Sequence, residues 1–226
     1  MAYILSIETA TNVCSVAIHR DGALTAHQEL FLEKSHSGLL TIMIDDLIDH
    51  CGIGINDLNA VALSEGPGSY TGLRIGASAA KGLAYSLEIP LIGVSTLEAM
   101  CRSVTLYDPK PILLCPMLDA RRMEVYCLVA NQDYEVIQEV HPHIVDQSSF
   151  LNILTDNKVV FFGNGASKCK EHIIHQNAFF IESVTPNAKH IGNLAYLKYK
   201  NDEFLDLAYF EPFYLKDFRP TQPRTL

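Results

Sequence analysis

A glycine-rich loop that leads from a predicted strand into a predicted helix has the clearest potential for chemistry in this sequence. Residues 65–76 read Glu-Gly-Pro-Gly-Ser-Tyr-Thr-Gly-Leu-Arg-Ile-Gly. Glycine lets a ligand or a second backbone approach closely, and the N–H groups at a helix start attract anions. No lysine follows Gly72 as in a Walker A motif, so a tight turn without a ligand is the alternative. The candidate phosphate contacts are Gly66, Gly68, Ser69, Thr71 and Gly72, of which Ser69 or Thr71 can cap the helix.

The N-terminal strand ends in a second candidate group. Residues 3–12 read as a strand that ends at Glu8 and enters a turn containing Thr9 and Thr11. A carboxylate at a strand end, followed by a small hydroxyl-rich hairpin, is similar to the first phosphate loop of actin-like ATPases and sugar kinases. The alternative is a solvated carboxylate beside ordinary turn-forming residues.

The elements that position these loops follow a regular order. The first half predicts three strands and then helix, strand, helix and strand, which is the repeated unit of the actin-like ATPase fold. A shortened second unit follows residues 104–110, so we predict an N-terminal subdomain over 1–104 and a smaller C-terminal subdomain over 105–226. The predicted helices cover residues 37–51, 71–87, 148–155 and 188–199, with one more from residue 96, and the predicted strands include 60–63, 91–94, 112–117, 123–128, 135–140 and 159–162.

Four motifs in chain order closely resemble the bacterial TsaB (YeaZ) family. They are Ile-Glu-Thr-Ala-Thr at 7–11, Lys-Ser-His-Ser at 34–37, the stretch from Ser64 to Gly76, and Leu-Asp-Ala-Arg-Arg-Met-Glu-Val-Tyr at 118–126. The resemblance covers nearly the whole chain and is strong through residue 126. It implies an α/β protein of the actin-like ATPase (sugar kinase/actin/chaperone) fold that helps make threonylcarbamoyladenosine beside the anticodon of tRNA.

The resemblance also implies a subunit that is not itself catalytic. The related enzyme TsaD and M22 glycoprotease-like proteins bind a metal through His-x-x-x-His after a Pro-x-x-Gly-Val segment. Here the matching segment starts at Pro90 and places Thr96 and Met100 at the ligand positions. Neither side chain replaces an imidazole for a divalent ion. We therefore expect no metal and no catalytic residue, while a stand-alone small-molecule kinase or M22-type peptidase-like hydrolase using Glu8 is the alternative.

The implied partners are a TsaD-like enzyme and a TsaE-like ATPase, with a homodimer when the chain is alone. No cofactor should be tightly bound, although ATP or ADP can bind weakly at or near the partner interface. We expect one surface on the first two predicted helices to serve both associations. The alternative is that the small residues of the second helix pack on the protein's own sheet. The predicted interface residues are Leu39, Ile42, Met43, Gly72, Leu73, Gly76, Ala80 and Ala84.

Composition limits the remaining functions. The 226 residues are 48% hydrophobic and carry a net charge of −9, which argues against independent nucleic-acid binding. The chain should therefore meet tRNA only through the complex, with a small RNA contact from the basic tail after Lys216 as the alternative. No apolar run is long enough for a membrane span and no signal peptide is evident, so a cytoplasmic location follows. The six cysteines are scattered and should be reduced and structural.

Three smaller features keep two interpretations each. His36, at a predicted helix start, could cap the helix or contact a ligand. His141 and His143 lie where a predicted strand ends, and a structural role there is favoured over a metal-binding pair. The dense charge at residues 119–124 predicts an ion-paired turn between strands, with a contact between subdomains or to a partner as the alternative.

Overall fold

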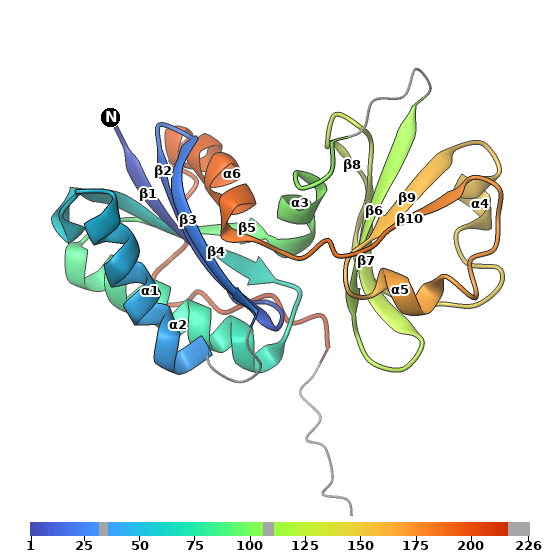
Figure 1. The fold of residues 1–226 in the computed structure, drawn as a ribbon, viewed down its shortest axis with the longest axis horizontal. Coiled ribbons are helices and arrows are strands. Elements are labelled where there is room, and N and C mark those ends of the chain that lie inside the picture. The colour runs from blue at the N-terminus through green and yellow to red at the C-terminus, as the bar shows by residue number, and fades with distance from the viewer. Residues whose placement is uncertain (32–35, 106–110, 217–226) are drawn as a thin grey trace, which may run out of the picture.

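The first of two five-stranded sheets occupies the left lobe of the molecule in Figure 1. The computed structural model describes residues 1–31, 36–105 and 111–216. β1, β2 and β3 form antiparallel hairpins, and β4 and β5 add in parallel beside β1. Asp21 and Gly22 both adopt positive φ in the turn between β2 and β3, as tight hairpin turns favour. The strands are β1 Tyr3–Glu8, β2 Val13–Arg20, β3 Ala23–Phe31, β4 Leu58–Gly66 and β5 Leu91–Ser95.

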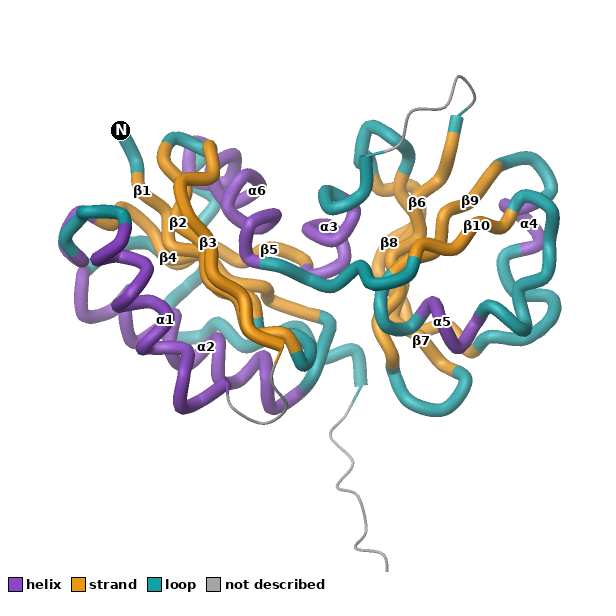
Figure 2. The backbone as a smooth tube through the Cα atoms, viewed as in Figure 1, coloured by secondary structure: helices purple, strands orange, loops and turns teal. Residues whose placement is uncertain are grey.

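Helices cover both faces of this sheet (Figures 1 and 2). α1 (His36–His50) and α2 (Tyr70–Leu87) pack on the face that carries Leu5 and Ile7. α6 (Ala188–Lys200) packs on the opposite face, where Ile4 lies. This division follows from the strand period of two, because neighbouring side chains of β1 point to opposite faces. A short 3-10 helix, η1 (Ile55–Asp57), leads into β4.

The second sheet repeats the topology of the first. Its order is β10-β9-β6-β7-β8, with antiparallel pairs β6–β7 and β7–β8 and parallel pairs β6–β9 and β9–β10. The predicted actin-like repeat is thus confirmed, and its second copy is short because α4 and α5 have four residues each. The elements are β6 Ile112–Asp119, β7 Glu124–Ala130, β8 Val136–Ile144, α4 Leu151–Leu154, β9 Lys158–Phe162, α5 Ala166–Cys169 and β10 Ala178–Ile181.

The last helix of each repeat carries the chain toward the other lobe. α3 (Thr96–Cys101) follows β5 but buries Leu97 and Met100 in the core beside β6. α6 follows the second sheet but returns to β1 and β2 of the first. The predicted C-terminal subdomain of residues 105–226 is therefore wrong at its end, because residues 188–213 pack on the first lobe. The predicted boundary falls partly on residues 106–110, outside the described residues.

A C-terminal strap, residues 205–216, continues across the first lobe (Figure 1). The Leu205 N–H donates to the Leu91 carbonyl at 2.9 Å, and the Phe213 N–H donates to the Glu65 carbonyl at 2.6 Å. Lys81 of α2 donates from Nζ to the carbonyl of Phe210 at 3.1 Å. Within the described residues no helix combines the length and apolar character that crossing a bilayer requires.

Candidate functional site

The two predicted phosphate loops lie against each other at one end of the first sheet. The Ser69 N–H donates to the Ala10 carbonyl at 2.7 Å. The Thr9 hydroxyl donates to the Gly72 carbonyl at 2.8 Å. β1 and β4 are parallel neighbours, so the chain leaves both strands at the same sheet edge and the loops meet there. The structure thus brings together residues that are far apart in sequence, since Thr9 and Gly72 are 63 positions apart.

The glycines of the loop are explained by the protein's own backbone. A Cβ atom added at Gly72 would lie 2.0 Å from the Thr9 carbonyl oxygen, and one at Gly68 would lie 2.6 Å from the Ala10 Cβ. Gly66 has a φ of +120° and leaves room for the Phe213 carbonyl of the C-terminal strap. The sequence predicted that glycine here admits either a ligand or a second backbone. At these positions a second backbone makes the close approach.

The start of α2 uses its N–H groups within the chain. Ser69 is the helix cap, since its hydroxyl accepts from the Gly72 N–H at 3.3 Å. The Ser69 carbonyl accepts from the Leu73 N–H at 2.8 Å. Thr71 is exposed on the first turn and does not cap the helix. Two of the four N–H groups that a helix start offers to an anion, those of Ser69 and Gly72, are thus already bonded within the chain, whereas the Leu73 N–H makes the first regular helical bond.

Glu8 is a fully buried carboxyl group at the base of the hairpin. Its Oε1 accepts from the Ala10 N–H at 2.6 Å and from the Ser64 hydroxyl at 2.9 Å, whereas Oε2 is buried without a partner among the described residues. Burial raises the pKa of Glu8 to about 7, and the hydrogen bonds from Ala10, Ser64 and Thr9 partly oppose this rise. The prediction of a solvated strand-end carboxylate is wrong. Glu8 instead ties β1, its turn and β4 together.

Thr11 lies beside these contacts at the partly buried end of the turn. Its hydroxyl accepts from the Val13 N–H at 3.3 Å, which fixes the start of β2. Thr11 therefore shapes the hairpin and Thr9 holds it to α2.

The positions that correspond to metal ligands in TsaD-like proteins are buried in the packing between the lobes. Thr96 and Met100 are 0% and 1% exposed. A Cβ atom added at Gly163 would lie 2.7 Å from the Met100 Cε, so this side chain fills the space beside the second sheet. Among residues 1–31, 36–105 and 111–216, no group of three or more metal-ligating side chains could hold an ion.

Most of the predicted interface residues are buried inside the first lobe. Leu73, Ala80 and Ala84 are at most 1% exposed, and Met43 is 2% exposed. Gly72 and Gly76 are buried as well, and a Cβ atom at Gly76 would lie 2.3 Å from the Thr9 Oγ1. The expectation that this ridge forms an exposed docking surface is therefore wrong, because it packs on the protein's own hairpin and sheet. Leu73 and Ala77 are buried as well.

Two residues of α1 remain at the surface. Ile42 is 53% exposed, and Leu39 is partly buried against the first core. The side chain of His36 and the residues Lys34 and Ser35 lie outside the described part of the chain.

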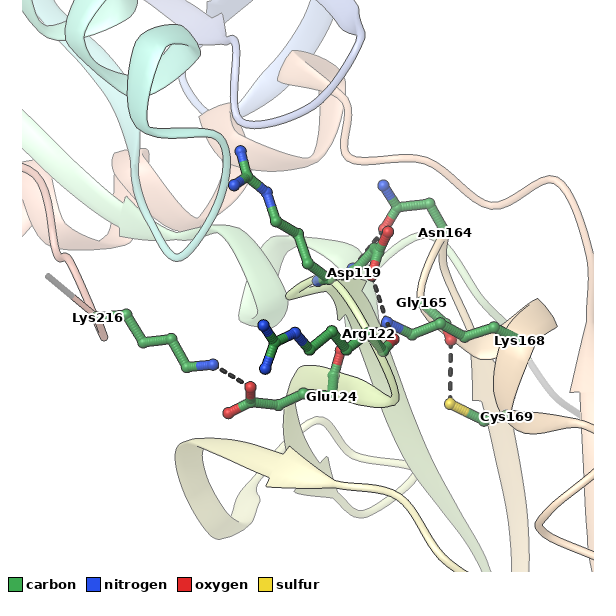
Figure 3. Close-up of polar contacts among 9 residues, drawn as sticks. Asp119, Arg122, Glu124, Asn164, Gly165, Lys168, Cys169 and Lys216 are labelled. Carbon is green, nitrogen blue, oxygen red and sulfur yellow. Dashed lines mark hydrogen bonds and ion pairs between the residues drawn. The ribbon is translucent and has the colours of Figure 1, made fainter. Parts of the chain in front are cut away.

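Charged side chains of the second lobe surround the turn between β6 and β7 (Figure 3). Lys168 of α5 pairs with Asp119 and donates to the carbonyls of Arg122 and Glu124 at 2.7 and 2.6 Å. The Asp119 N–H donates to Asn164 Oδ1 at 3.0 Å. Lys216 of the C-terminal strap pairs with Glu124 and thereby links the lobes. The predicted ion-paired turn is confirmed only for its acidic residues, which pair with lysines distant in sequence, whereas no ion pair within residues 119–124 occurs in the described structure.

A thiol and an imidazole that sequence reasoning did not connect meet on the second sheet. Cys127 and His141 are register partners on β7 and β8, with 3.7 Å between Sγ and Nε2. Hydrogen bonds from Cys115 and His141 lower the pKa of Cys127 to about 6. Cys127 is 0% exposed, so solvent does not reach the sulfur. All six cysteines are free thiols. The only sequence signal for this contact was that Cys127 and His141 lie on two consecutive predicted strands, which can pair side by side.

Comparison with known proteins gives one coherent group. The family model for TsaD, tRNA N6-adenosine threonylcarbamoyltransferase, matches residues 31–219. A Bacillus subtilis (strain 168) relative, "tRNA threonylcarbamoyladenosine biosynthesis protein TsaB", is 32% identical over 218 residues, or 94% of this chain and 93% of the relative. The Escherichia coli (strain K12) protein of the same description is 43% identical over 130 residues, and this match spans 58% of this chain and 55% of that relative.

Solved structures give the same picture of the fold. YeaZ from Pseudomonas aeruginosa superposes with a TM-score of 0.79 at 25% identity, over 95% of this chain and all of that one. A further structure from the same organism, described as similar to peptidase YEAZ, has a TM-score of 0.82 at 24% identity and covers 96% of this chain.

Proposed function

The chain belongs to the TsaB family of tRNA threonylcarbamoyladenosine biosynthesis proteins, and we propose that it serves as a non-catalytic subunit that activates a TsaD-like enzyme. The modified nucleoside would form next to the anticodon of tRNA on that enzyme. A TsaE-like ATPase would complete the assembly. In this arrangement the chain supplies a folded surface and no reacting group.

The observation that carries this proposal is the direct packing of the two loops. The hairpin carbonyl of Thr9 fills the space above Gly72, and the N–H groups of Ser69 and Gly72, two of the four that α2 could offer to an anion, have partners within the chain. A kinase or hydrolase of this fold would need such groups for the transferred phosphate or for the attacking water. The buried Thr96 and Met100 also offer no imidazole at the position where TsaD-like proteins hold a metal.

Nucleotide binding by the isolated chain should accordingly be weak. We expect a dissociation constant for ATP or ADP of about 0.1 mM or weaker, equivalent to roughly −5 kcal/mol. Isothermal titration calorimetry on the purified chain, with and without a divalent ion, measures this constant. A low micromolar value would contradict the non-catalytic assignment and favour a kinase.

The surface offered to the partner would include the exposed side of α1. Ile42 is a large apolar side chain that is 53% exposed, whereas its neighbours Met43 and Ile44 are buried. Ile42→Glu should leave the fold intact and weaken association with the TsaD-like enzyme and with a second copy. Gln147→Glu, at an exposed position of the second lobe away from α1, is the matched control for the added charge.

Reconstitution tests the proposed function directly. Unmodified tRNA is incubated with the TsaD-like enzyme, the TsaE-like ATPase, ATP and a threonylcarbamoyl donor, with or without this chain, and the nucleosides are measured by mass spectrometry. We expect product only when this chain and the TsaD-like enzyme are both present. Product from this chain alone, or full activity without it, would refute the proposal.

A further inference from the structure

The turn between β6 and β7 carries two adjacent arginines that the fold does not use. We call residues 119–124 the arginine turn. Arg121 and Arg122 are exposed, and within the described residues neither guanidinium has a hydrogen-bond or ion-pair partner. The acidic residues of the same turn are already neutralised, Asp119 by Lys168 and Glu124 by Lys216. Figure 3 shows the guanidinium of Arg122 extending toward the side from which Lys216 approaches.

The backbone of the arginine turn is unusual for these residue types. Arg121 has a φ of +67° and Arg122 has a φ of +50°. This left-handed region favours glycine and asparagine, and long side chains rarely occupy it twice in succession. Since neither guanidinium has a hydrogen-bond or ion-pair partner in the described chain that would compensate for this conformation, the turn has the features of a recognition element.

The charge balance of the arginine turn identifies the chemistry of its partner. The four cationic side chains of Arg121, Arg122, Lys168 and Lys216 face two carboxylates, so this turn has a local excess of two positive charges on a chain whose net charge is −9. Planar guanidinium groups match the oxygens of a phosphate. Protein–protein interfaces are enriched in arginine but depleted in lysine, so the presence of Lys168 and Lys216 beside the arginines favours a phosphate partner.

We propose that the arginine turn contacts the phosphate backbone of tRNA when the chain is assembled with a TsaD-like enzyme, an inference that rests on the proposed function. Lys216 brings the C-terminal strap to this turn through its ion pair with Glu124. The cations therefore belong to two segments that meet at one place. Because the rest of the chain is acidic, the arginine turn adds to RNA affinity within the complex and does not bind RNA alone.

Two double variants test the proposal. Arg121→Gln with Arg122→Gln removes both charges and keeps polar side chains. Arg121→Asn with Arg122→Gly also removes both charges, but it introduces the residue types that left-handed backbone favours, so the fold should be at least as stable. The matched control is Arg20→Gln with Lys200→Gln, which makes the same change in net charge at exposed positions of the first lobe.

The measurement is the affinity of the complex with the TsaD-like enzyme for tRNA at several salt concentrations. Each lost phosphate contact should weaken binding about five- to eightfold at 0.1 M salt, and both together should flatten the slope of log K against log[salt] by about 1.5–2. The control variant should bind as the parent does. Melting temperature and gel filtration with the enzyme accompany every measurement.

Two results would overturn the inference. Unchanged tRNA affinity and salt slope in both double variants would show that the arginines do not contact RNA. Loss of association with the TsaD-like enzyme would show that the arginine turn is a protein contact instead. These two results on the variants differ from failure of the proposed function. If the proposed function is wrong, the parent chain itself does not increase the amount of modified tRNA.

Discussion

At the scale of single residues, Glu8 is the side chain whose environment departs most from its sequence context. It follows five strand residues and precedes a polar turn, so its position is typical of an exposed carboxylate. The fold buries it because Ser64 of β4, 56 residues away, comes to its side. Burial of this kind depends on strand pairing and could not be predicted from the turn alone. Its consequence is a carboxyl group that ionises near neutral pH.

Replacing Glu8 by glutamine should change how stability depends on pH. The pKa of Glu8 is raised from 4.5 to about 7 in the folded chain, so the stability that the protonated group contributes is full below pH 4.5 and is lost as pH rises through 7. Glu8→Gln keeps the hydrogen-bond acceptor without the charge. Relative to the parent, it should gain stability between pH 5 and pH 8, approaching roughly 3 kcal/mol.

Urea unfolding at a series of pH values measures this difference. Glu139→Gln, which neutralises an exposed carboxylate on β8, is the control for the change in net charge. A stability difference between Glu8→Gln and the parent that does not vary with pH would contradict the assigned role of Glu8.

At the scale of elements, α2 shows what sequence patterns determine and what they leave open. Its approximate start and its end followed from the glycine-rich loop and the apolar spacing, whereas the choice between Ser69 and Thr71 as its cap stayed open. The direction of its small residues did not, because a smooth ridge can face either a partner or the protein's own hairpin. The four-residue α5 and the strand β10 were also not predicted, since segments this short carry too little periodicity. The two candidate loops could be located from the sequence, but their mutual contact required the parallel pairing of β1 and β4.

Two glycines of α2 should respond in opposite ways to alanine. Gly72→Ala places a Cβ atom where the Thr9 carbonyl lies, so the hairpin must move and the free energy of unfolding should fall by about 1–3 kcal/mol. Gly82→Ala has no atom within 4 Å of the new Cβ and should raise stability by about 0.5–1 kcal/mol. Thermal and urea unfolding of both variants measure these changes. Equal effects at the two positions would contradict the close packing of the loops.

At the scale of the whole molecule, the two lobes are not separable along the chain. α6 buries Ile191 and Ala195 against the first sheet, and the strap packs Leu205, Leu207 and Phe210 on the first core. The repeated order of strands suggested two consecutive halves. Nothing in the local pattern of α6 indicated which sheet it covers, because an amphipathic helix fits either one.

A chain that ends at residue 186 should therefore fail to form a stable first lobe. It keeps all ten strands of the described residues, but it leaves the apolar face of Ile4, Ala60 and Ala62 uncovered. We expect a lower melting temperature, binding of a hydrophobic dye and rapid proteolysis in the first lobe. The control is a chain that ends at Lys216, which retains α6 and the strap. Parent-like melting of the shorter chain would contradict the joint architecture.

The return of α6 also sets the order of events during synthesis on the ribosome. The first five strands leave the exit tunnel early, yet the helix that covers one face of their sheet is made about a hundred residues later, a delay on the order of 5–20 s at typical bacterial elongation rates. For that interval the nascent sheet exposes Ile4, Ala60, Ala62 and Ile92 together. The newborn chain therefore presents exposed apolar surface of the kind that chaperones protect, and it completes its fold only after its last helix emerges.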